Sequence, residues 1–292
     1  MRDAGRTGVA VGFFDGVHVA HRELLSQAAA AFTFRNHPLG VLAPARAPRL
    51  ILSCEERLAE LRGCGLAEVV AVDFTRELAD TAPEDFAATL LGLAAAHSPA
   101  GARPRVLCGP DWRFGRGGAG DAALLRRLGA EVVEMPAVEY RGASVSSTRI
   151  REALERGEMA DASAMLGRPF RVAGEVFPGK GEGRRLGFPT VNVRPDLGDG
   201  AERRVVPPRG VYAVDFRSVR AVANFGVAPT MGGAAWKEPV WELHLADGAA
   251  ATPGPGERVD FALLRFLRPE RVFASAAELR EQIEKDCKEA FR

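Results

Sequence analysis

Two histidines follow a short hydrophobic stretch near the start of the chain. The sequence GFFDGVHVAH, residues 12–21, places His18 and His21 three positions apart, after Gly12 and Gly16. Residues at this spacing lie on one face of a helix. The pair is therefore compatible with half of a metal site, with a cradle for a phosphate group, or with the ordinary start of a helix.

Of these alternatives, a phosphate site explains the stretch best. A tetrahedral zinc site needs three or four ligands, and the further candidates Asp15 and His37 come without a second paired motif. The glycines allow a tight turn after a buried strand at 8–14. In an open α/β sheet, ligands bind outside the carboxyl ends of the strands, where a helix N-terminus favours an anion. We therefore expect His18 and His21 to donate hydrogen bonds to an α-phosphate.

A second polar cluster, VSSTRIR, supports the phosphate interpretation. It offers the hydroxyls of Ser146, Ser147 and Thr148 at a predicted helix start, followed by Arg149 and Arg151. Hydroxyl and guanidinium groups at a helix N-terminus suit a triphosphate. Taken alone, the stretch would more often be a capping sequence with solvated arginines. Together with the histidine turn, it predicts the other half of a nucleotide site.

The second half of the chain carries a different set of polar residues. A Gly-rich basic loop precedes PTVN, in which Thr190 and Asn192 face the same side of a strand. A hydroxyl and an amide carbonyl are oxygen ligands that suit Mg²⁺. The loop is not a P-loop, because no Lys-Ser/Thr pair closes it and a strand follows. In VWELHL, Glu242 alternates with apolar residues and is a candidate general base, although either set also fits a solvated strand face.

The elements that must position these residues are of two kinds. In the first half, short apolar runs alternate with helical patterns, which predicts a parallel sheet with crossover helices. In the second half, period-two alternation between Gly/Pro-rich turns predicts a small antiparallel barrel. Ser275 and Glu278 then form a capping box for a C-terminal amphipathic helix. We predict two domains, 1–163 and 164–292.

Composition limits the class of protein. The 292 residues are 47% hydrophobic and 26% charged, and a net charge of +1 is too balanced for a protein that coats nucleic acid or an acidic membrane. The chain shows no signal-peptide core and no apolar run of the roughly 18 residues that a membrane helix needs. We expect a soluble cytoplasmic protein, a monomer or weak homo-oligomer, with no nucleic-acid or membrane partner.

With these motifs in this order, the chain resembles the bacterial bifunctional riboflavin kinase/FAD synthetase family. GFFDGVHVAH, TFRNHP, GPDWRFG and SSTRIREAL are similar to its nucleotidyltransferase part, and the Gly-rich loop, PTVN, NFGVAPT and ELH to its flavokinase barrel. The resemblance covers nearly the whole chain. It implies a Rossmann-like α/β domain followed by a flavokinase-like β-barrel. It also implies a transferase that uses ATP and Mg²⁺ to phosphorylate riboflavin to FMN and to adenylylate FMN to FAD, with release of pyrophosphate.

The resemblance also implies roles for individual residues. The catalytic residues would be His18, His21, Arg151 and Glu242. The ATP and its phosphates would be bound by Gly12, Phe14, Asp15, Gly16, Ser146, Ser147, Thr148, Arg149, Gly179, Lys180, Gly181, Gly183 and Arg185. The flavin would be bound by His37, Pro38, Asp111, Phe114, Asn224 and Arg268, and the metal by Thr190 and Asn192.

The first half departs from the family pattern in two places. Only residues 22–32 separate His21 from Thr33, where the pattern is longer, and Asn36 stands where FxPHP has a proline. Helix, return and strand must therefore fit into a crossover that usually takes a dozen or more residues. Two alternatives stay open: a riboflavin kinase with a degenerate first domain, and a non-catalytic flavin- or nucleotide-binding regulator. The retained Glu242 argues against the regulator, because a binding module needs no base.

Overall fold

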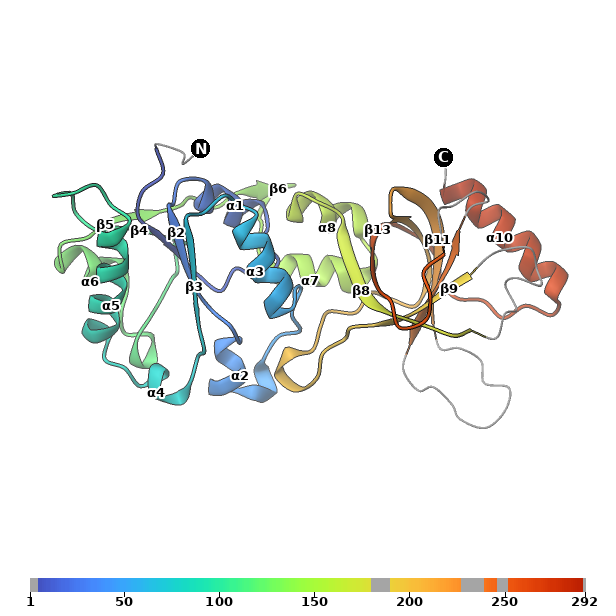
Figure 1. Cartoon of the computed structure of the whole chain (residues 1–292), viewed down its shortest axis with the longest axis horizontal. Helices are drawn as coiled ribbons and strands as arrows, with labels where there is room; N and C mark the ends of the chain where they lie inside the picture. Colours follow the sequence, from blue (N-terminus) through green and yellow to red (C-terminus); the bar gives the residue numbers. More distant parts are fainter. Residues whose placement is uncertain (1–4, 180–189, 227–238, 246–251, 291–292) are drawn as a thin grey trace. The chain divides into compact units, whose positions relative to one another are not determined.

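The computed structural model describes residues 5–179, 190–226, 239–245 and 252–290 and forms two compact units (Figure 1). The first unit comprises Met1–Arg149 and Gly198–Arg204, and the second comprises Ile150–Leu197 and Val205–Arg292. The short segment 198–204 therefore belongs to the first unit although it lies in the second half of the sequence. The functional boundary between residues 163 and 164 stays a prediction.

A five-stranded parallel sheet forms the centre of the first unit, as predicted. Its order is β3-β2-β1-β4-β5, and every neighbouring pair is parallel. The strands are β1 (Val9–Val11), β2 (Ala30–Phe34), β3 (Glu68–Val72), β4 (Arg105–Cys108) and β5 (Glu131–Glu134). Because the chain adds strands first on one side of β1 and then on the other, the order reverses between β1 and β4. Ligands bind at such a reversal, beyond the carboxyl ends of the strands.

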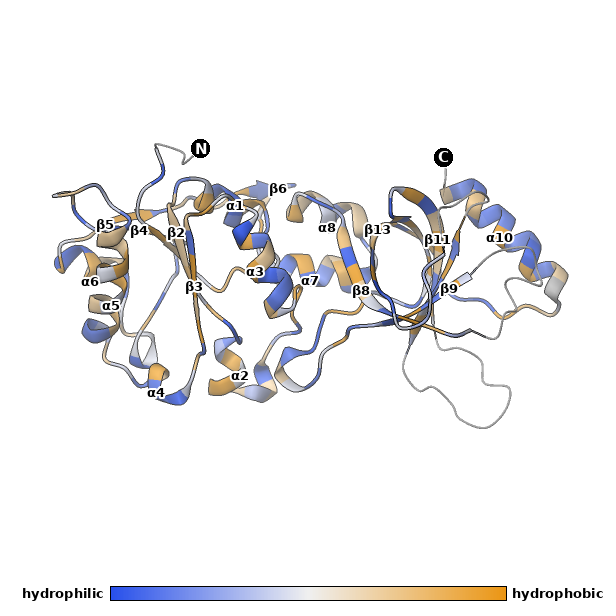
Figure 2. Ribbon diagram, in the orientation of Figure 1, coloured by the Kyte–Doolittle hydropathy of each residue, from blue (hydrophilic) through white to orange (hydrophobic). Residues whose placement is uncertain are grey.

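Helices cover both faces of this sheet and bury two apolar layers. Those of the first unit are α1 (Val19–Ser26), α2 (Pro38–Leu42), α3 (Cys54–Arg62), α4 (Arg76–Ala79), α5 (Pro83–Ala96) and α6 (Ala122–Arg127). One layer packs Phe86 and Leu90 of α5 against the sheet, and the other packs Leu25 of α1 and Leu61 of α3. In Figure 2 the strands of this sheet carry many residues in the orange of hydrophobic side chains.

The short crossover between β1 and β2 is complete. Helix α1 has eight residues, and only residues 27–29 lie between it and β2. The return is compact because Ala28 is fully buried and the backbone N–H groups of Ala29 and Ala30 both donate to the carbonyl of Gly8 at 3.1 Å. All five residues of β2 pair with β3, and three of them also pair with β1. The shortened sequence thus still forms a full second strand.

The second unit contains the predicted antiparallel barrel. It is closed in the order β10-β11-β12-β9-β8-β13. The strands are β8 (Phe170–Phe177), β9 (Thr190–Pro195), β10 (Gly210–Phe216), β11 (Val219–Gly226), β12 (Val240–Leu245) and β13 (Arg258–Arg268). Trp241 is 1% exposed and forms the centre of the interior, stacked on Phe225 at 4.4 Å and in edge contact with Tyr212 and Phe261.

Helices flank the barrel strands in the sequence on both sides. They are α7 (Ser147–Arg156) and α8 (Met159–Leu166) before β8, and α10 (Ala276–Ala290) after β13. The hydroxyl of Ser275 accepts the N–H of Glu278 at 3.2 Å, which confirms the predicted cap of α10. None of the helices in the described part of the chain combines the length and hydrophobicity of a membrane span.

A buried arginine ties the carboxyl ends of β1 and β2 together. Arg57 of α3 is 1% exposed. Its guanidinium donates to the carbonyl of Phe13 and the hydroxyl of Thr33, both at 3.0 Å, and to the carbonyls of Phe34 and Arg35, both at 2.8 Å. These acceptors lie where β1 and β2 end, so Arg57 fixes the edge of the sheet at which a ligand would bind.

Replacing this arginine should loosen the first unit. In Arg57→Met the side chain keeps much of its volume, but the buried acceptors lose their donor. We expect the opening free energy of the first unit to fall by about 3 kcal/mol or more. Native-state hydrogen exchange of the β1 and β2 amides measures this quantity. Arg62→Met, at an exposed position on the same helix, is the control, and an equal change in both variants would contradict the assignment.

Candidate active sites

The loop between β1 and α1 is strained. Phe14 and Val17 have φ angles of 58° and 40°, in a region that non-glycine residues seldom occupy, and Gly16 has a φ of 83°. For a β-branched residue such as Val17 this is a genuine outlier. Backbone strain of this kind persists only where the surroundings determine it and is concentrated at functional sites. Contacts from elsewhere in the chain must therefore hold this loop in its strained conformation.

Asp15 anchors this loop. It is 3% exposed, and its carboxylate accepts the backbone N–H of Ile51 at 3.0 and 3.1 Å and that of Leu52 at 3.2 Å. Its own carbonyl accepts the hydroxyl of Ser147 at 2.9 Å. The two motifs that the sequence analysis paired, the glycine-histidine turn and the serine-rich helix start, thus meet at one residue.

The two predicted catalytic histidines form a stacked pair at the start of α1. His18 caps the helix, its Nδ1 accepts the N–H of His21 at 3.3 Å, and the ring centroids lie 3.5 Å apart. Because Nδ1 of His18 accepts, its proton is assigned to Nε2, which is then a donor. Burial lowers the pKa of His21 well below 6.5, and the neighbouring His18 lowers it further. His21 is therefore a neutral imidazole at pH 7, suited to hydrogen bonding rather than to charge neutralisation.

The predicted phosphate-binding residues at the start of α7 differ from one another in their contacts and exposure. The hydroxyl of Ser146 accepts the N–H of Arg149 at 3.3 Å, and Thr148 is exposed. The guanidinium of Arg149 donates to the carbonyls of Ser144 at 2.9 Å and Tyr140 at 3.1 Å in the hairpin of β6 (Glu139–Tyr140) and β7 (Ala143–Ser144). Arg149 thus braces this hairpin. Arg151 follows in the part of α7 that belongs to the second unit.

The residues predicted to bind flavin in the first unit divide between loop and core. His37 caps α2 with an Nδ1 contact of 3.1 Å from the N–H of Leu39, and Pro38 is the first residue of that helix. The ring of His37 packs edge-on against Phe13 with centroids 4.7 Å apart. Asp111 is exposed in the loop after β4. Phe114, at 6% exposure, packs in the core, and its flavin role stays a prediction.

Asn36, which stands where the resemblance implies a proline, makes two side-chain hydrogen bonds that a proline could not make. Its amide donates to the carbonyl of Phe74 at 2.9 Å and its side-chain oxygen accepts the N–H of Phe74 at 2.8 Å. The two hydrogen bonds tie the loop after β2 to the loop after β3. This departure from the family pattern therefore supports the edge of the sheet.

In the barrel, strand register brings the predicted residues onto one face. Glu242 lies directly opposite Asn224 on β11 and opposite Asn192 on β9. Thr190, two residues before Asn192, lies opposite His244. Directly opposite residues point to the same side of a sheet, and the alternate residues of β12 are buried in the barrel interior. Thr190, Asn192, Asn224 and Glu242 therefore share the outer face. The alternation predicted this for Thr190 with Asn192, and it predicted that Glu242 lies on the side of β12 away from Trp241.

The donor set on this face fits a hard divalent cation. A threonine hydroxyl, an asparagine amide oxygen and a carboxylate are oxygen ligands of the type that Mg²⁺ accepts while it keeps waters and phosphates. A Cβ at Gly179 would lie 2.0 Å from Nδ2 of Asn192, so the backbone at the end of β8 passes close to that amide. Lys180, Gly181, Gly183 and Arg185 lie outside the described residues. Within the described ranges, no cluster of three or more His, Cys, Asp or Glu side chains forms a metal site.

Helix α10 carries a buried acidic residue that pairs with a predicted flavin ligand. Asp286 is 3% exposed and accepts from Arg268 Nε at 3.0 Å and Nη2 at 2.7 Å. Gln282 also donates to Asp286, at 2.8 Å. Burial lowers the pKa of His244 on β12 to about 4, while the Asp286 charge acts in the opposite direction. Arg268 is thus held by α10, and its flavin role stays a prediction.

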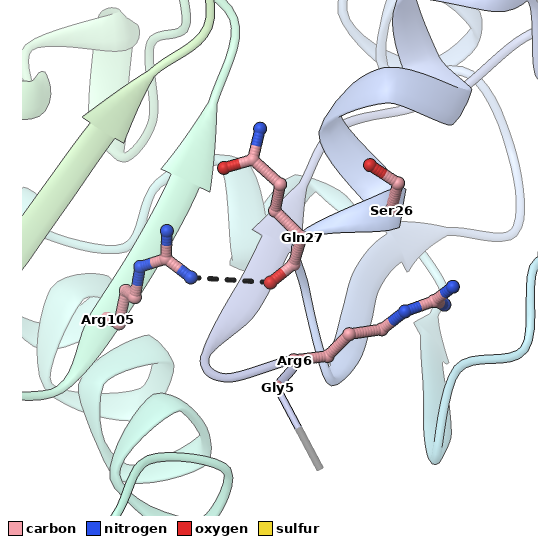
Figure 3. A pocket seen from close by; sticks show the side chains of 5 residues that line it. All are labelled: Gly5, Arg6, Ser26, Gln27 and Arg105. Carbon is pink, nitrogen blue, oxygen red and sulfur yellow. Dashed lines mark hydrogen bonds between the residues drawn. The ribbon is translucent and has the colours of Figure 1, made fainter. Parts of the chain in front are cut away.

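A cavity at the opposite end of the parallel sheet is shown in Figure 3. It has a volume of about 370 Å³ and is lined by Gly5, Arg6, Ser26, Gln27 and Arg105. Arg105 donates to the carbonyl of Gln27 at 3.3 Å. These residues lie at the amino ends of β1 and β4, whereas ligands in open α/β sheets bind at the carboxyl ends. The cavity is therefore separate from the site around Asp15.

Two supporting residues have no recognisable signal in the sequence. Arg57 appears there as one charged residue among several in a helical pattern, and Arg204 lies in a loop far along the chain. Only the fold brings them near residues 13–15 and 51. Both act on backbone carbonyls, which no residue pattern reveals.

The fold and the two polar sites define a nucleotidyltransferase-type α/β unit joined to a flavokinase-type barrel. The model of the FAD synthetase family matches residues 1–149, and that of the riboflavin kinase family matches residues 166–292. The chain belongs to the family of bifunctional riboflavin kinase/FMN adenylyltransferases. It is 34% identical to the member from Escherichia coli K12, over 94% of this chain and 89% of the relative.

Further relatives agree over the full length. The bifunctional riboflavin kinase/FMN adenylyltransferase of Bacillus subtilis is 30% identical over 99% of this chain and 93% of its own. A crystal structure described as a macrolide-efflux protein from Streptococcus pneumoniae matches with a TM-score of 0.81 and 28% identity, covering 98% of this chain and 94% of that one. Each of these similarities extends over both units of the chain.

The lowered pKa of His244 should make the second unit sensitive to acid. The unfolded chain binds a proton at this residue near pH 6.5, whereas the folded chain binds it only at about pH 4. The contribution of His244 to stability is therefore fully present above pH 6.5 and is lost as the pH drops towards 4, at a cost of about 1–3 kcal/mol. Urea unfolding at several pH values, followed through the buried Trp241, measures the effect. His244→Gln should flatten this dependence, and an unchanged slope would contradict the assignment.

Proposed function

We propose that the chain phosphorylates riboflavin to FMN in the barrel and adenylylates FMN to FAD in the α/β unit. The observation that supports this most is the alignment of Asn224, Glu242 and Asn192 across three barrel strands, because it sets a carboxylate between two amides on one face. The α/β unit independently offers a strained loop that begins a helix at the carboxyl edge of a parallel sheet. Two nucleotide reactions account for both sites.

In the kinase reaction, Glu242 acts on a neutral nucleophile. The 5′-hydroxyl of riboflavin must lose a proton as it attacks the γ-phosphorus of ATP, and a carboxylate in hydrogen-bond reach accepts it. Asn192 and Asn224 lie directly opposite Glu242, so the carboxylate has a polar amide side chain on each neighbouring strand. Thr190 and Asn192 would hold Mg²⁺, which when bound offsets the negative charge of the phosphates. The transfer ends with FMN and ADP.

In the adenylyl transfer no base is needed. The phosphate of FMN is already anionic and attacks the α-phosphorus of ATP, so that the bond to pyrophosphate breaks. The protein must hold the two phosphates in line and stabilise the charge that develops. Nε2–H of His18 and the N-terminus of α1 supply hydrogen-bond donors for the α-phosphate. Ser147, fixed on the Asp15 carbonyl, places the start of α7 beside the same loop.

The kinase-only alternative rests on the short segment between His21 and Thr33. The complete β2 strand and the intact contacts of Asp15 favour two activities over one. The choice of Mg²⁺ among divalent metals, the cytoplasmic location and the monomeric or weakly oligomeric state stay predictions. A regulator without catalysis is disfavoured by Glu242 on the barrel face.

A single assay separates the alternatives and tests the base. Riboflavin, ATP and Mg²⁺ are incubated with the chain, and FMN and FAD are separated by chromatography. Glu242→Gln, which keeps size and hydrogen bonding, should lower FMN formation by about 10²–10⁴-fold. It should leave the conversion of supplied FMN to FAD unchanged. Glu175→Gln, an exposed carboxylate on β8, is the matched control. Near-normal kinase turnover in Glu242→Gln would exclude this role.

The histidine pair is tested by a substitution that keeps the helix cap. Asparagine caps helices well, so His18→Asn removes the imidazole donor while α1 keeps its start. We expect FAD formation from FMN to fall by about 10–100-fold, because one donor to the developing charge is lost. The kinase rate should not change. His97→Asn, a histidine of the same unit that pairs with Glu68, should behave as wild type, and equal losses in both variants would refute the role of His18.

A further inference from the structure

A short segment from the second half of the sequence completes the first unit. Residues Gly198–Arg204, here called the β9–β10 strap, lie between β9 and β10 in the chain but belong to the α/β unit. The strap contains the 3₁₀ turn η3 (Gly200–Glu202) and is drawn beside α2 in Figure 1. A Cβ on Gly40 of α2 would lie 3.1 Å from the Cβ of Ala201, which shows how closely they pack.

The strap pairs with the segment that follows α2. Leu50 and Arg204 form a parallel β-bridge, and the N–H of Leu50 donates to the carbonyl of Arg203 at 2.8 Å. Leu50 and Ile51 are 1% and 0% exposed. A buried backbone segment needs partners for its polar groups, and here the strap supplies them.

Arg204 makes the charged contacts of the strap. It is 8% exposed, and its Nη2 donates to the carbonyl of Ile51 at 2.9 Å and pairs with Oε2 of Glu56 at 2.7 Å. The same Glu56 oxygen accepts the N–H of Ser53 at 2.8 Å in the capping box of α3. One guanidinium therefore fixes both the Ile51 peptide and the start of α3.

The Ile51 residue is held from two sides. Its N–H donates to the carboxylate of Asp15, and its carbonyl accepts from Arg204. Asp15 in turn holds the strained loop that leads to His18. If residue 51 moves, its N–H group moves with it, and the hydrogen bond that holds the carboxylate of Asp15 is distorted.

We propose that Arg204 is a positioning residue for adenylyl transfer: it touches no substrate but fixes residues 51–53, against which Asp15 holds the nucleotide loop. The proposal rests on the proposed FAD-forming activity. It also means that residues 1–149, the span of the FAD synthetase family model, do not hold all the residues that this site needs.

The test compares two neighbouring arginines of the strap in the full-length chain. In Arg204→Met we expect kcat for FAD formation from FMN to fall about tenfold or more, because misplacement of reacting groups by about 1 Å costs up to about 10²-fold. The KM for ATP should change much less than kcat, and the kinase rate should stay at the wild-type value. Arg204→Lys should recover part of the FAD rate, because one ammonium can meet both acceptors.

Arg203→Met is the matched control. It removes the same charge from the same strap, but the side chain of Arg203 is exposed and donates to the carbonyl of Gly200 within the strap, at 3.2 Å. The backbone carbonyl that Leu50 uses is retained. We expect wild-type rates of both reactions.

Three results would overturn the proposal: a FAD rate in Arg204→Met within about twofold of wild type, an equal loss in Arg203→Met, or a parallel loss of kinase activity. If Arg204→Met is not recovered folded, Glu56→Gln takes its place. It weakens the ion pair from the other side and keeps an acceptor for Ser53, with the same expected direction and the same refuting result. A wild-type chain that makes no FAD would refute the proposed function itself, whereas a wild-type chain that makes FAD with an unaffected Arg204 variant refutes only this inference.

Discussion

Asp15 is a buried carboxylate that accepts hydrogen bonds from two backbone N–H groups of the first unit. An unpaired charge at 3% exposure would be strongly unfavourable. The N–H groups of Ile51 and Leu52 remove that penalty and at the same time join two loops that are far apart in the sequence. The strained φ angles of Phe14 and Val17 depend on this bond set, since nothing in their own residue types favours such a backbone.

Two buried arginines fix further backbone groups near Asp15. Arg57 binds the carbonyls at the ends of β1 and β2, and Arg204 binds the carbonyl of Ile51. Removing one partner of a buried charged group is strongly destabilising, because the other partner is left without its hydrogen bonds. The edge of the sheet is therefore defined by side chains acting on backbone groups rather than by hydrophobic packing, which stabilises the layers behind it.

The fold class and the face of several site residues were predictable from the sequence, whereas strand register and contacts between distant segments were not. Strand and helix periodicity predicted the parallel sheet and the barrel, and the alternation in VWELHL predicted the side of β12 on which Glu242 lies. Periodicity cannot reveal register, so the alignment of Glu242 with Asn192 and Asn224 needed the structure. The placement of 198–204 in the first unit was not predicted, because a loop that leaves its own domain has no local signal. The core packing of Phe114 was likewise not visible in the sequence, because the residue lies in a loop motif outside the periodic segments.

The residue types at the two sites agree with the different demands of the two reactions. A neutral hydroxyl needs a proton acceptor, and the barrel face supplies a carboxylate. An FMN phosphate carries its negative charge already, so a carboxylate beside it would repel the nucleophile. The α/β unit accordingly uses the only carboxylate of its nucleotide loop, Asp15, as a buried acceptor for backbone N–H groups. The groups left at the start of α1 are imidazoles, and the lowered pKa of His21 keeps that ring neutral. This separation of roles lets one chain run both steps of flavin activation with ATP as the common co-substrate.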